Sequence, residues 1–195
     1  MKKIIFLILF QVTIFEITAQ SNDEYLILCN EINKIVDKEF ILPVKDQEIH
    51  SIVDSFWGYG YKRDIFTDEI WFSNVGLFRF YKPNCIFGMP VNIYSMTDGI
   101  VENIFHNGIY GITIVIKFEE IEICYMLVLP IDNIQKGSTI KKGDLIGCIY
   151  RSSYYCAIGY GLMLNLKYKN YYFDLSLLLS RKIYYHNYSL QENRK

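Results

Sequence analysis

The chain has 195 residues, a formal net charge of −1 and a hydrophobic content of 51%. This length suffices for one domain with its own core, and the near-zero charge lacks the basic excess of most nucleic-acid-binding domains. Aromatic residues make up 16% of the chain, including 17 tyrosines and 13 phenylalanines. Because these residues favour strands, the composition predicts a β-rich domain that does not bind nucleic acid.

The N-terminus has the layout of a secretory signal peptide. Lys2 and Lys3 precede an apolar run over residues 4–15, and Ala19 offers a small residue for cleavage. The run is shorter than the ~20 apolar residues that a membrane-spanning helix needs. We therefore expect residues 1–19 to be removed. The mature chain is expected to be exported, to the periplasm or the medium, with no membrane span.

The rest of the chain divides into a helix, a β domain and a tail. Residues 23–39 have apolar side chains on one helical face, which predicts a helix within residues 20–40. Short strands and turns are expected over residues 41–180, and a polar, fraying tail over residues 181–195. The expected strands cover residues 101–105, 112–118, 121–129, 138–150 and 162–173.

Two turn signals are specific. Asn107-Gly108 between apolar runs predicts a hairpin, because both residue types tolerate a positive φ. The run IQKGSTIKKGDLIG, residues 134–147, repeats glycine at short intervals, and we expect its glycines in tight turns between short strands. Biotinyl and lipoyl carrier domains use a similar glycine-rich hairpin. They also need an exposed lysine at a hairpin tip, flanked by methionine or acidic residues, which this run lacks.

The cysteines leave their pairing open. Their number is odd and no Cys-x-x-Cys occurs, so spacing does not predict a disulfide, and most are expected to be small buried apolar residues. A thiolate metal site using Cys85, Cys148 and Cys156 would need further convergent ligands. The five are Cys29, Cys85, Cys124, Cys148 and Cys156.

Five segments, in this order, resemble LytM/lysostaphin-type zinc peptidases, which are peptidoglycan endopeptidases. They match the family's Pro-Val opening, its Gly-Thr-Pro-Val … Asp-Gly-x-Val stretch, its Gly-Tyr-Gly-x-x-Val-x-Ile strand, its glycine-repeat segment and its closing Val-Asp-Pro. The resemblance covers residues 41–179 and implies a small antiparallel β-sandwich. The segments are ILPVKDQEIHSIVDSFWGYGYKRD (41–64), GMPVNIYSMTDGIV (88–101), IFHNGIYGITIVI (104–116), IQKGSTIKKGDLIG (134–147) and NYYFDLSLLL (170–179).

The resemblance also implies a zinc site, and the expected positions lack its ligands. In the family, a His-x-x-x-Asp pair and the second histidine of a His-x-His strand hold zinc, and two further histidines act on the water and the intermediate. Counting from Asp98, Gly137 and Gly147 puts the metal positions at Phe80, Asn84 and Gly161 and the catalytic positions at Val128 and Gly159.

A shifted register does not restore the ligands, because no histidine occurs between residues 107 and 185. His50, His106 and His186 are far apart and not at ligand spacing, so we expect ordinary surface or turn residues. The sequence thus predicts a chain without catalytic residues, metal or cofactor.

The predicted function is that of an inactive LytM-like module that binds peptidoglycan or an envelope protein. Some inert members of the family regulate cell-wall amidases, which makes a regulatory role an expectation from the family alone. A groove left by the lost site would be rimmed by aromatic side chains, for each of which filling of the core is the competing interpretation. The candidates are Trp57, Tyr59, Tyr61, Phe80, Tyr81 and Tyr160.

Two alternatives stay open. One is an active zinc-dependent peptidoglycan endopeptidase with ligands in another register. The other is a secreted structural or host-facing β protein without affinity for the cell wall.

Overall fold

The computed structural model divides the chain into two units, residues 1–35 and 36–195. Residues 26–39 are helical, which confirms the expected helix for its described part. Every described strand belongs to the second unit. Among the described residues, no helix has the length and apolar character to span a membrane. The described residues are 26–46, 48–52, 61–63, 70–72, 75–81, 90–106, 112–149, 160–169, 171–173 and 175–193.

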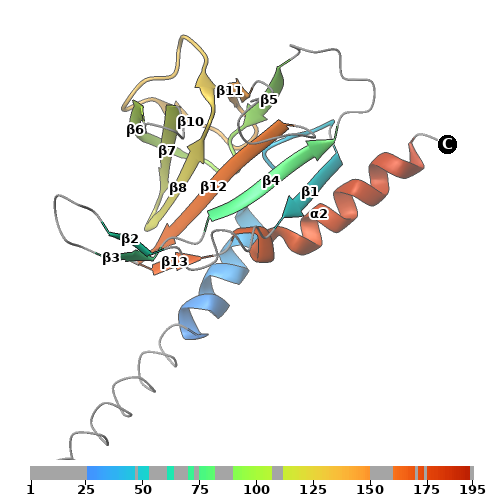
Figure 1. The fold of residues 1–195 in the computed structure, drawn as a ribbon, viewed down its shortest axis with the longest axis horizontal. Helices are drawn as coiled ribbons and strands as arrows, with labels where there is room; N and C mark the ends of the chain where they lie inside the picture. Colours follow the sequence, from blue (N-terminus) through green and yellow to red (C-terminus); the bar gives the residue numbers. More distant parts are fainter. Residues whose placement is uncertain are drawn as a thin grey trace, which may run out of the picture. The chain divides into compact units, whose positions relative to one another are not determined.

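The second unit is built on an antiparallel main sheet of eight strands, in the order β1-β4-β12-β8-β7-β6-β10, with β13 on β12 (Figure 1). A three-stranded sheet has the order β5-β11-β9, and β2 pairs with β3 separately. The strands are β1 (Glu48–Ile52), β2 (Tyr61–Arg63), β3 (Ile70–Phe72), β4 (Val75–Tyr81), β5 (Val91–Tyr94), β6 (Gly99–His106), β7 (Ile112–Phe118), β8 (Ile121–Met126), β9 (Leu129–Pro130), β10 (Thr139–Ile140), β11 (Leu145–Ile149), β12 (Tyr160–Tyr168) and β13 (Tyr171–Phe173). The expected antiparallel β fold is confirmed.

The two strands of the predicted hairpin pair with each other. His106 of β6 pairs with Ile112 of β7, and the Asn107-Gly108 turn itself lies outside the described residues. The turn after β7 uses Glu119, at a φ of 53°. The single strand expected over residues 121–129 is wrong, because Leu127 adopts a φ of 67° and separates β8 from β9.

The main sheet has an inner face that forms the core. Directly opposed residues of antiparallel strands point to the same face, and Tyr125 of β8 lies opposite Leu164 of β12 and Ile114 of β7. None of these three side chains has exposed surface. The Tyr125 hydroxyl reaches the backbone of Met96, between β5 and β6, so this face contacts the segment that leaves the smaller sheet.

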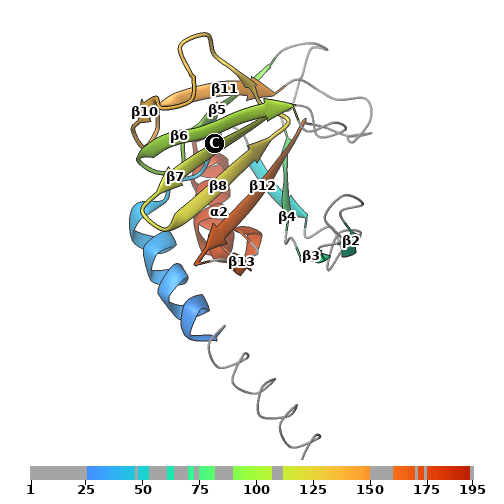
Figure 2. The same ribbon diagram turned by 90° about the vertical axis from the view of Figure 1, so that its left-hand side faces the viewer.

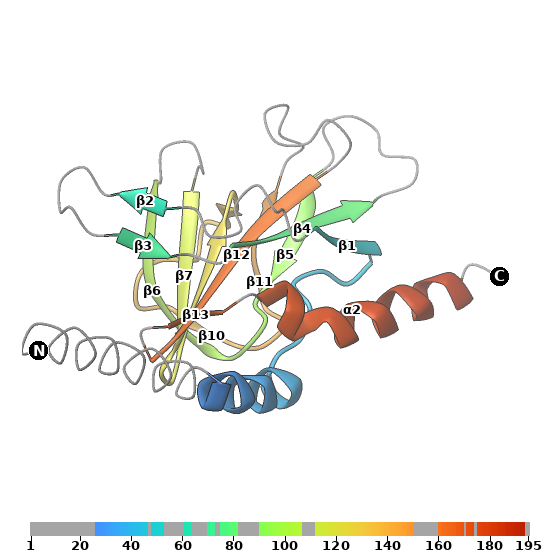
Figure 3. The ribbon, with the colours of Figure 1, turned by 60° about the horizontal axis from the view of Figure 1, so that its bottom comes forward.

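The C-terminal segment differs from the expected tail. It forms the helix α2 (Leu175–Glu192), which runs alongside β1 (Figure 3). Leu175, Leu179 and Ile183 are buried at helical spacing. Asn187 then covers the outer edge of β1: its Oδ1 accepts from the Ile49 N–H at 2.9 Å, and its Nδ2 donates to the Ile49 carbonyl at 2.8 Å.

The glycine run divides into two kinds of position. Gly137 and Gly143 adopt φ values of 89° and 85°, which confirms them as turn glycines. Gly147 lies inside β11 at a register shift, so the turn expected there is wrong. A Cβ at Gly147 would overlap the Leu129 carbonyl oxygen and approach Val128 Cγ1 at 2.6 Å, so this position needs glycine for space.

Candidate functional site

The outer face of the main sheet, opposite Tyr125, carries two rows of small and apolar residues. One row consists of Val115, Cys124 and Asn165, which are direct register partners on β7, β8 and β12. The next row consists of Thr113, Met126 and Met163 on the same strands. All except Cys124 are at least nine-tenths buried, and Cys124 is half-buried. We call these six residues the outer-face cluster.

Two polar atoms of the outer-face cluster have no partner among the described residues. The Thr113 hydroxyl oxygen and Asn165 Oδ1 are buried, and neither forms a hydrogen bond in the part of the chain that the structure describes. A buried polar group without a partner costs about 1–3 kcal/mol. Such groups are rare in folded proteins and point to a bound water or ligand.

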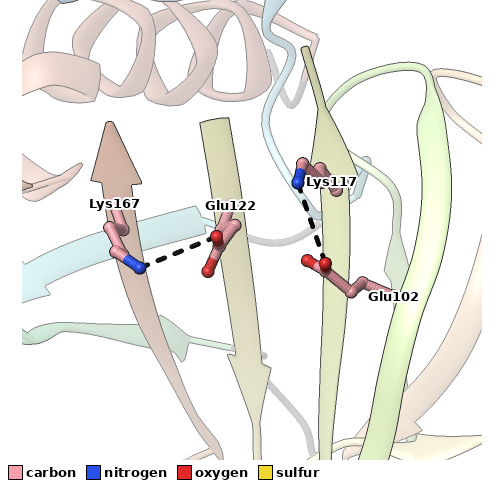
Figure 4. A network of polar contacts seen from close by, with 4 residues as sticks. All are labelled: Glu102, Lys117, Glu122 and Lys167. Carbon is pink, nitrogen blue, oxygen red and sulfur yellow. Dashed lines mark ion pairs between the residues drawn. The ribbon is translucent and has the colours of Figure 1, made fainter. Parts of the chain in front are cut away.

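A row of alternating charges borders the outer-face cluster (Figure 4). Lys167 Nζ lies 3.7 Å from Glu122 Oε1, and Lys117 Nζ lies 3.8 Å from Glu102 Oε1. Glu122 is the register partner of both lysines, so the charges alternate across β12, β8 and β7 to β6. The side chains are about one-third to one-half exposed, so each pair adds little stability. The outer-face cluster therefore ends at this row of charged side chains.

The outer-face cluster also holds a described thiol. Burial raises the pKa of Cys124 to about 11, and the nearby Glu122 carboxylate adds to the rise. Cys29, Cys124 and Cys148 are free thiols, whereas Cys85 and Cys156 lie outside the described residues. The thiolate metal site considered from the sequence therefore rests on two residues that the structure does not describe.

Two of the expected zinc-site positions lie on neighbouring strands. Phe80 of β4 pairs with Tyr160 of β12, next to Gly161. Val128 lies between β8 and β9, after Leu127, where the pairing of β8 with β12 has ended. Val128 has no exposed surface, and its N–H donates to the Ile112 carbonyl at 3.3 Å.

Moving an expected zinc position by one residue on β4 would not supply a ligand. Phe80 lies opposite Tyr160, so these two positions share a face, and Gly161 lies opposite Arg79. Position 79 therefore shares the face of Gly161, but an arginine is no better a zinc ligand than a phenylalanine. Asn84 and Gly159 lie outside the described residues. Within the described ranges, no three His, Cys, Asp or Glu residues form a potential metal-binding group.

The histidines lie on three different elements, β1, β6 and α2. Counting along the sequence missed one relationship: His50 is the register partner of Arg79, which is the partner of Gly161. His50 therefore lies in the row of the expected metal position, two strands away. The sequence around His50 could have indicated a strand, but it does not reveal which strands lie beside it.

The pairing brings together only part of the predicted aromatic rim. Phe80 and Tyr160 are register partners, and Tyr81 follows Phe80 on β4. Tyr61 belongs to the separate β2–β3 pair. Trp57 and Tyr59 lie outside the described residues. Sequence reasoning missed Thr113 and Asn165, although Asn165 interrupts an apolar run and could have been noticed.

Comparison with known proteins identifies the fold. No model of a known protein family and no curated protein matches the chain. A Ruminococcus gnavus protein, assigned as the glycyl-glycine endopeptidase LytM, has a similar structure with a TM-score of 0.51 and 18% identity, over 73% of this chain and 60% of that one. At this identity the likeness concerns the fold alone.

Two further solved structures resemble the chain. A Pseudomonas aeruginosa protein assigned to the M23 peptidases has a TM-score of 0.49 and 14% identity, over 72% of this chain and 50% of that one. A zinc-containing peptidase from Vibrio cholerae has a TM-score of 0.44 and 18% identity, over 70% of this chain and 39% of that one. This chain thus spans less than two thirds of each of these proteins. The β domain has the fold of LytM/lysostaphin-type peptidases.

Proposed function

We propose that this chain is an exported, catalytically inactive LytM-type domain that binds peptidoglycan or an envelope protein. The observation that supports the proposal is the pairing of Phe80 with Tyr160, next to Gly161, which puts two expected metal positions on neighbouring strands. No imidazole or carboxylate occurs at the expected positions, which are Phe80, Asn84, Val128, Gly159 and Gly161. A fold does not confer an activity whose site residues are absent.

The outer-face cluster supports binding without catalysis. Thr113 Oγ1 and Asn165 Oδ1 lie among buried aliphatic and sulfur-containing side chains and have no donor within the described ranges. Backbone N–H groups of a peptide, whether a stem peptide or a protein segment, are donors that match them. The Ruminococcus gnavus protein is assigned as a peptide-cleaving enzyme. A peptide ligand is thus the natural class to test on this scaffold.

The first experiment measures zinc in the chain without its predicted signal peptide, after equilibration with zinc and desalting. We expect no bound metal. One tightly bound zinc per chain would overturn the proposed inactivity and favour the active endopeptidase, which a peptidoglycan hydrolysis assay with and without chelator would then test.

The second experiment measures binding. The chain is sedimented with insoluble peptidoglycan and, in parallel, used to capture envelope proteins. We expect retention by at least one of the two. Retention by neither would overturn the binding role and favour the structural or host-facing alternative.

A further inference from the structure

The outer-face cluster gathers three sulfur-containing side chains on two neighbouring strands. Met126 of β8 lies directly opposite Met163 of β12, and Cys124 packs against this pair. Figure 2 shows β8 and β12 side by side in the main sheet. Opposed residues have Cβ atoms about 4.5–5.5 Å apart, and residues two apart on one strand point to the same face. Because methionine side chains are long and flexible, the three sulfur atoms can converge on one point.

Apolar filling does not account for the whole of this cluster. The core lies on the opposite face of the sheet, around Tyr125. Asn165 is the direct register partner of Cys124, and its side chain is more than nine-tenths buried. Its Oδ1 has no hydrogen-bond partner within the described ranges. A buried oxygen without a partner, placed beside the three sulfur side chains, points to a bound group at this position.

The donor atoms select the class of ligand. Thiolate and thioether sulfur atoms are soft donors that favour Cu(I), whereas carboxylate, carbonyl and water oxygen atoms suit magnesium and calcium. Protein zinc sites use cysteine, histidine and carboxylate ligands, so two methionines do not fit a zinc site. An amide oxygen is a known weak axial ligand of copper. The combination of one thiol, two thioethers and one amide oxygen therefore fits Cu(I).

Charge balance also favours a monovalent ion. The outer-face cluster contains no charged side chain, and an uncompensated buried charge is costly. When the Cys124 sulfur binds the metal, its S–H bond breaks and the proton goes to solvent. The resulting thiolate and Cu(I) are together neutral, whereas a divalent ion would leave a net positive charge. Copper and sulfur keep their oxidation states, so the step needs no oxidant or reductant.

We propose that this chain binds one Cu(I) ion through the sulfur atoms of Cys124, Met126 and Met163. Asn165 Oδ1 is the weak fourth ligand. This inference goes beyond the proposed function. The Thr113 hydroxyl, on β7, stays available to the proposed peptide ligand, so the two inferences stand or fall separately.

The first measurement titrates the chain without its predicted signal peptide with Cu(I), anaerobically, against a coloured Cu(I) chelator. We expect one ion to be held, with sulfur ligands in its X-ray absorption spectrum. Cys124→Ala should lose this ion. Cys148→Ala is the matched control, because Cys148 is a free thiol on β11 that should not contribute. A wild-type chain that holds no Cu(I), or an ion that Cys124→Ala still holds, would overturn the proposal.

A methionine variant tests the thioether ligands without opening a cavity. Met163→Leu keeps the volume and apolar character of the side chain, and we expect its affinity for Cu(I) to fall at least about tenfold. Met96→Leu is the matched control, because Met96 is fully buried and lies outside the outer-face cluster. Circular dichroism establishes that each variant is folded. Equal affinities of the two variants would show that Met163 is not a ligand and would overturn the proposal. Retention by peptidoglycan, measured on the same variants, reports separately on the proposed function.

Discussion

The hydroxyl group of Tyr125 accepts a 2.9 Å hydrogen bond from the backbone N–H of Met96. Tyr125 lies in the middle of the main sheet, and Met96 lies in the segment that joins β5 of the smaller sheet to β6. Neither side chain has exposed surface. The Met96 carbonyl in turn accepts a 2.8 Å hydrogen bond from Ile41. One phenol therefore fixes the segment on which the two sheets and the start of the β domain meet.

We predict that Tyr125→Phe lowers the free energy of unfolding by about 1–3 kcal/mol, because it leaves the buried Met96 N–H without its acceptor. Urea unfolding followed by tryptophan fluorescence measures this change. Tyr184→Phe is the matched control, since Tyr184 is 65% exposed on α2 and should lose far less. Equal losses in the two variants would show that the hydrogen bond from Met96 to Tyr125 does not contribute to the free energy of unfolding.

The same tyrosine predicts a pH dependence. Burial raises the pKa of Tyr125 above its ordinary value, and the hydrogen bonds to Met96 and Ser95 oppose the rise only in part. Below about pH 10 the folded and unfolded states both keep the proton, so the contribution is constant. As the pH rises further the unfolded chain loses its proton first, and stability falls. The fall measured by urea unfolding should be shallower in Tyr125→Phe, and parallel curves would contradict this.

The sequence predicted individual strands better than it predicted which strands lie side by side. Alternation located β6, β7 and β12, because this signal is local. The helix α2 was missed, although Leu175, Leu179 and Ile183 have helical spacing, because a polar C-terminal end dominated the interpretation. The strand order lies beyond local patterns, and it alone brings Thr113 and Asn165 to one face and His50 into the row of Gly161.

The positions counted for the zinc site lie on or next to three strands. Counting from Asp98, Gly137 and Gly147 led to Phe80, Val128 and Gly161. Phe80 and Gly161 lie on the neighbouring strands β4 and β12, and Val128 lies between β8 and β9. The outer-face cluster followed only from pairing, since an unpaired hydroxyl such as that of Thr113 leaves no mark in a sequence. Burial is a property of three-dimensional packing, which the local sequence does not encode.

The glycine run gives a prediction with an internal control. Gly147→Ala should destabilise the chain strongly, because the new methyl group would overlap the Leu129 carbonyl oxygen and Val128 Cγ1 within the β9–β11 pairing. Gly137→Ala meets no atom within 4 Å and strains only its φ of 89°, which costs about 1–2 kcal/mol. Thermal unfolding of both variants measures which one loses more stability. A smaller loss at Gly147 than at Gly137 would show that β11 can shift to admit the methyl group.

Cys124 should be an unreactive thiol. With burial raising its pKa to about 11, only about one molecule in a thousand carries the reactive thiolate at pH 8. A variant that keeps Cys124 as its single cysteine should therefore react slowly with a disulfide reagent and speed up on unfolding in urea. The matched variant keeps only Cys148, a half-buried thiol on β11. Faster labelling of the Cys124 variant than of the Cys148 variant would contradict the raised pKa of Cys124.

Thr113 tests the outer-face cluster itself. Its hydroxyl oxygen is buried and has no partner in the part of the chain that the structure describes. Thr113→Val, which keeps the shape and removes the polar atom, should therefore leave stability unchanged or raise it by up to about 1 kcal/mol. If the hydroxyl serves a ligand, the same variant should be retained less by peptidoglycan or by the captured envelope protein. Thr139→Val on β10 is the control, because Thr139 is exposed and should change neither property. A clear loss of stability in Thr113→Val would show instead that the hydroxyl is satisfied by a bound water, because only a group with a partner loses free energy when it is removed.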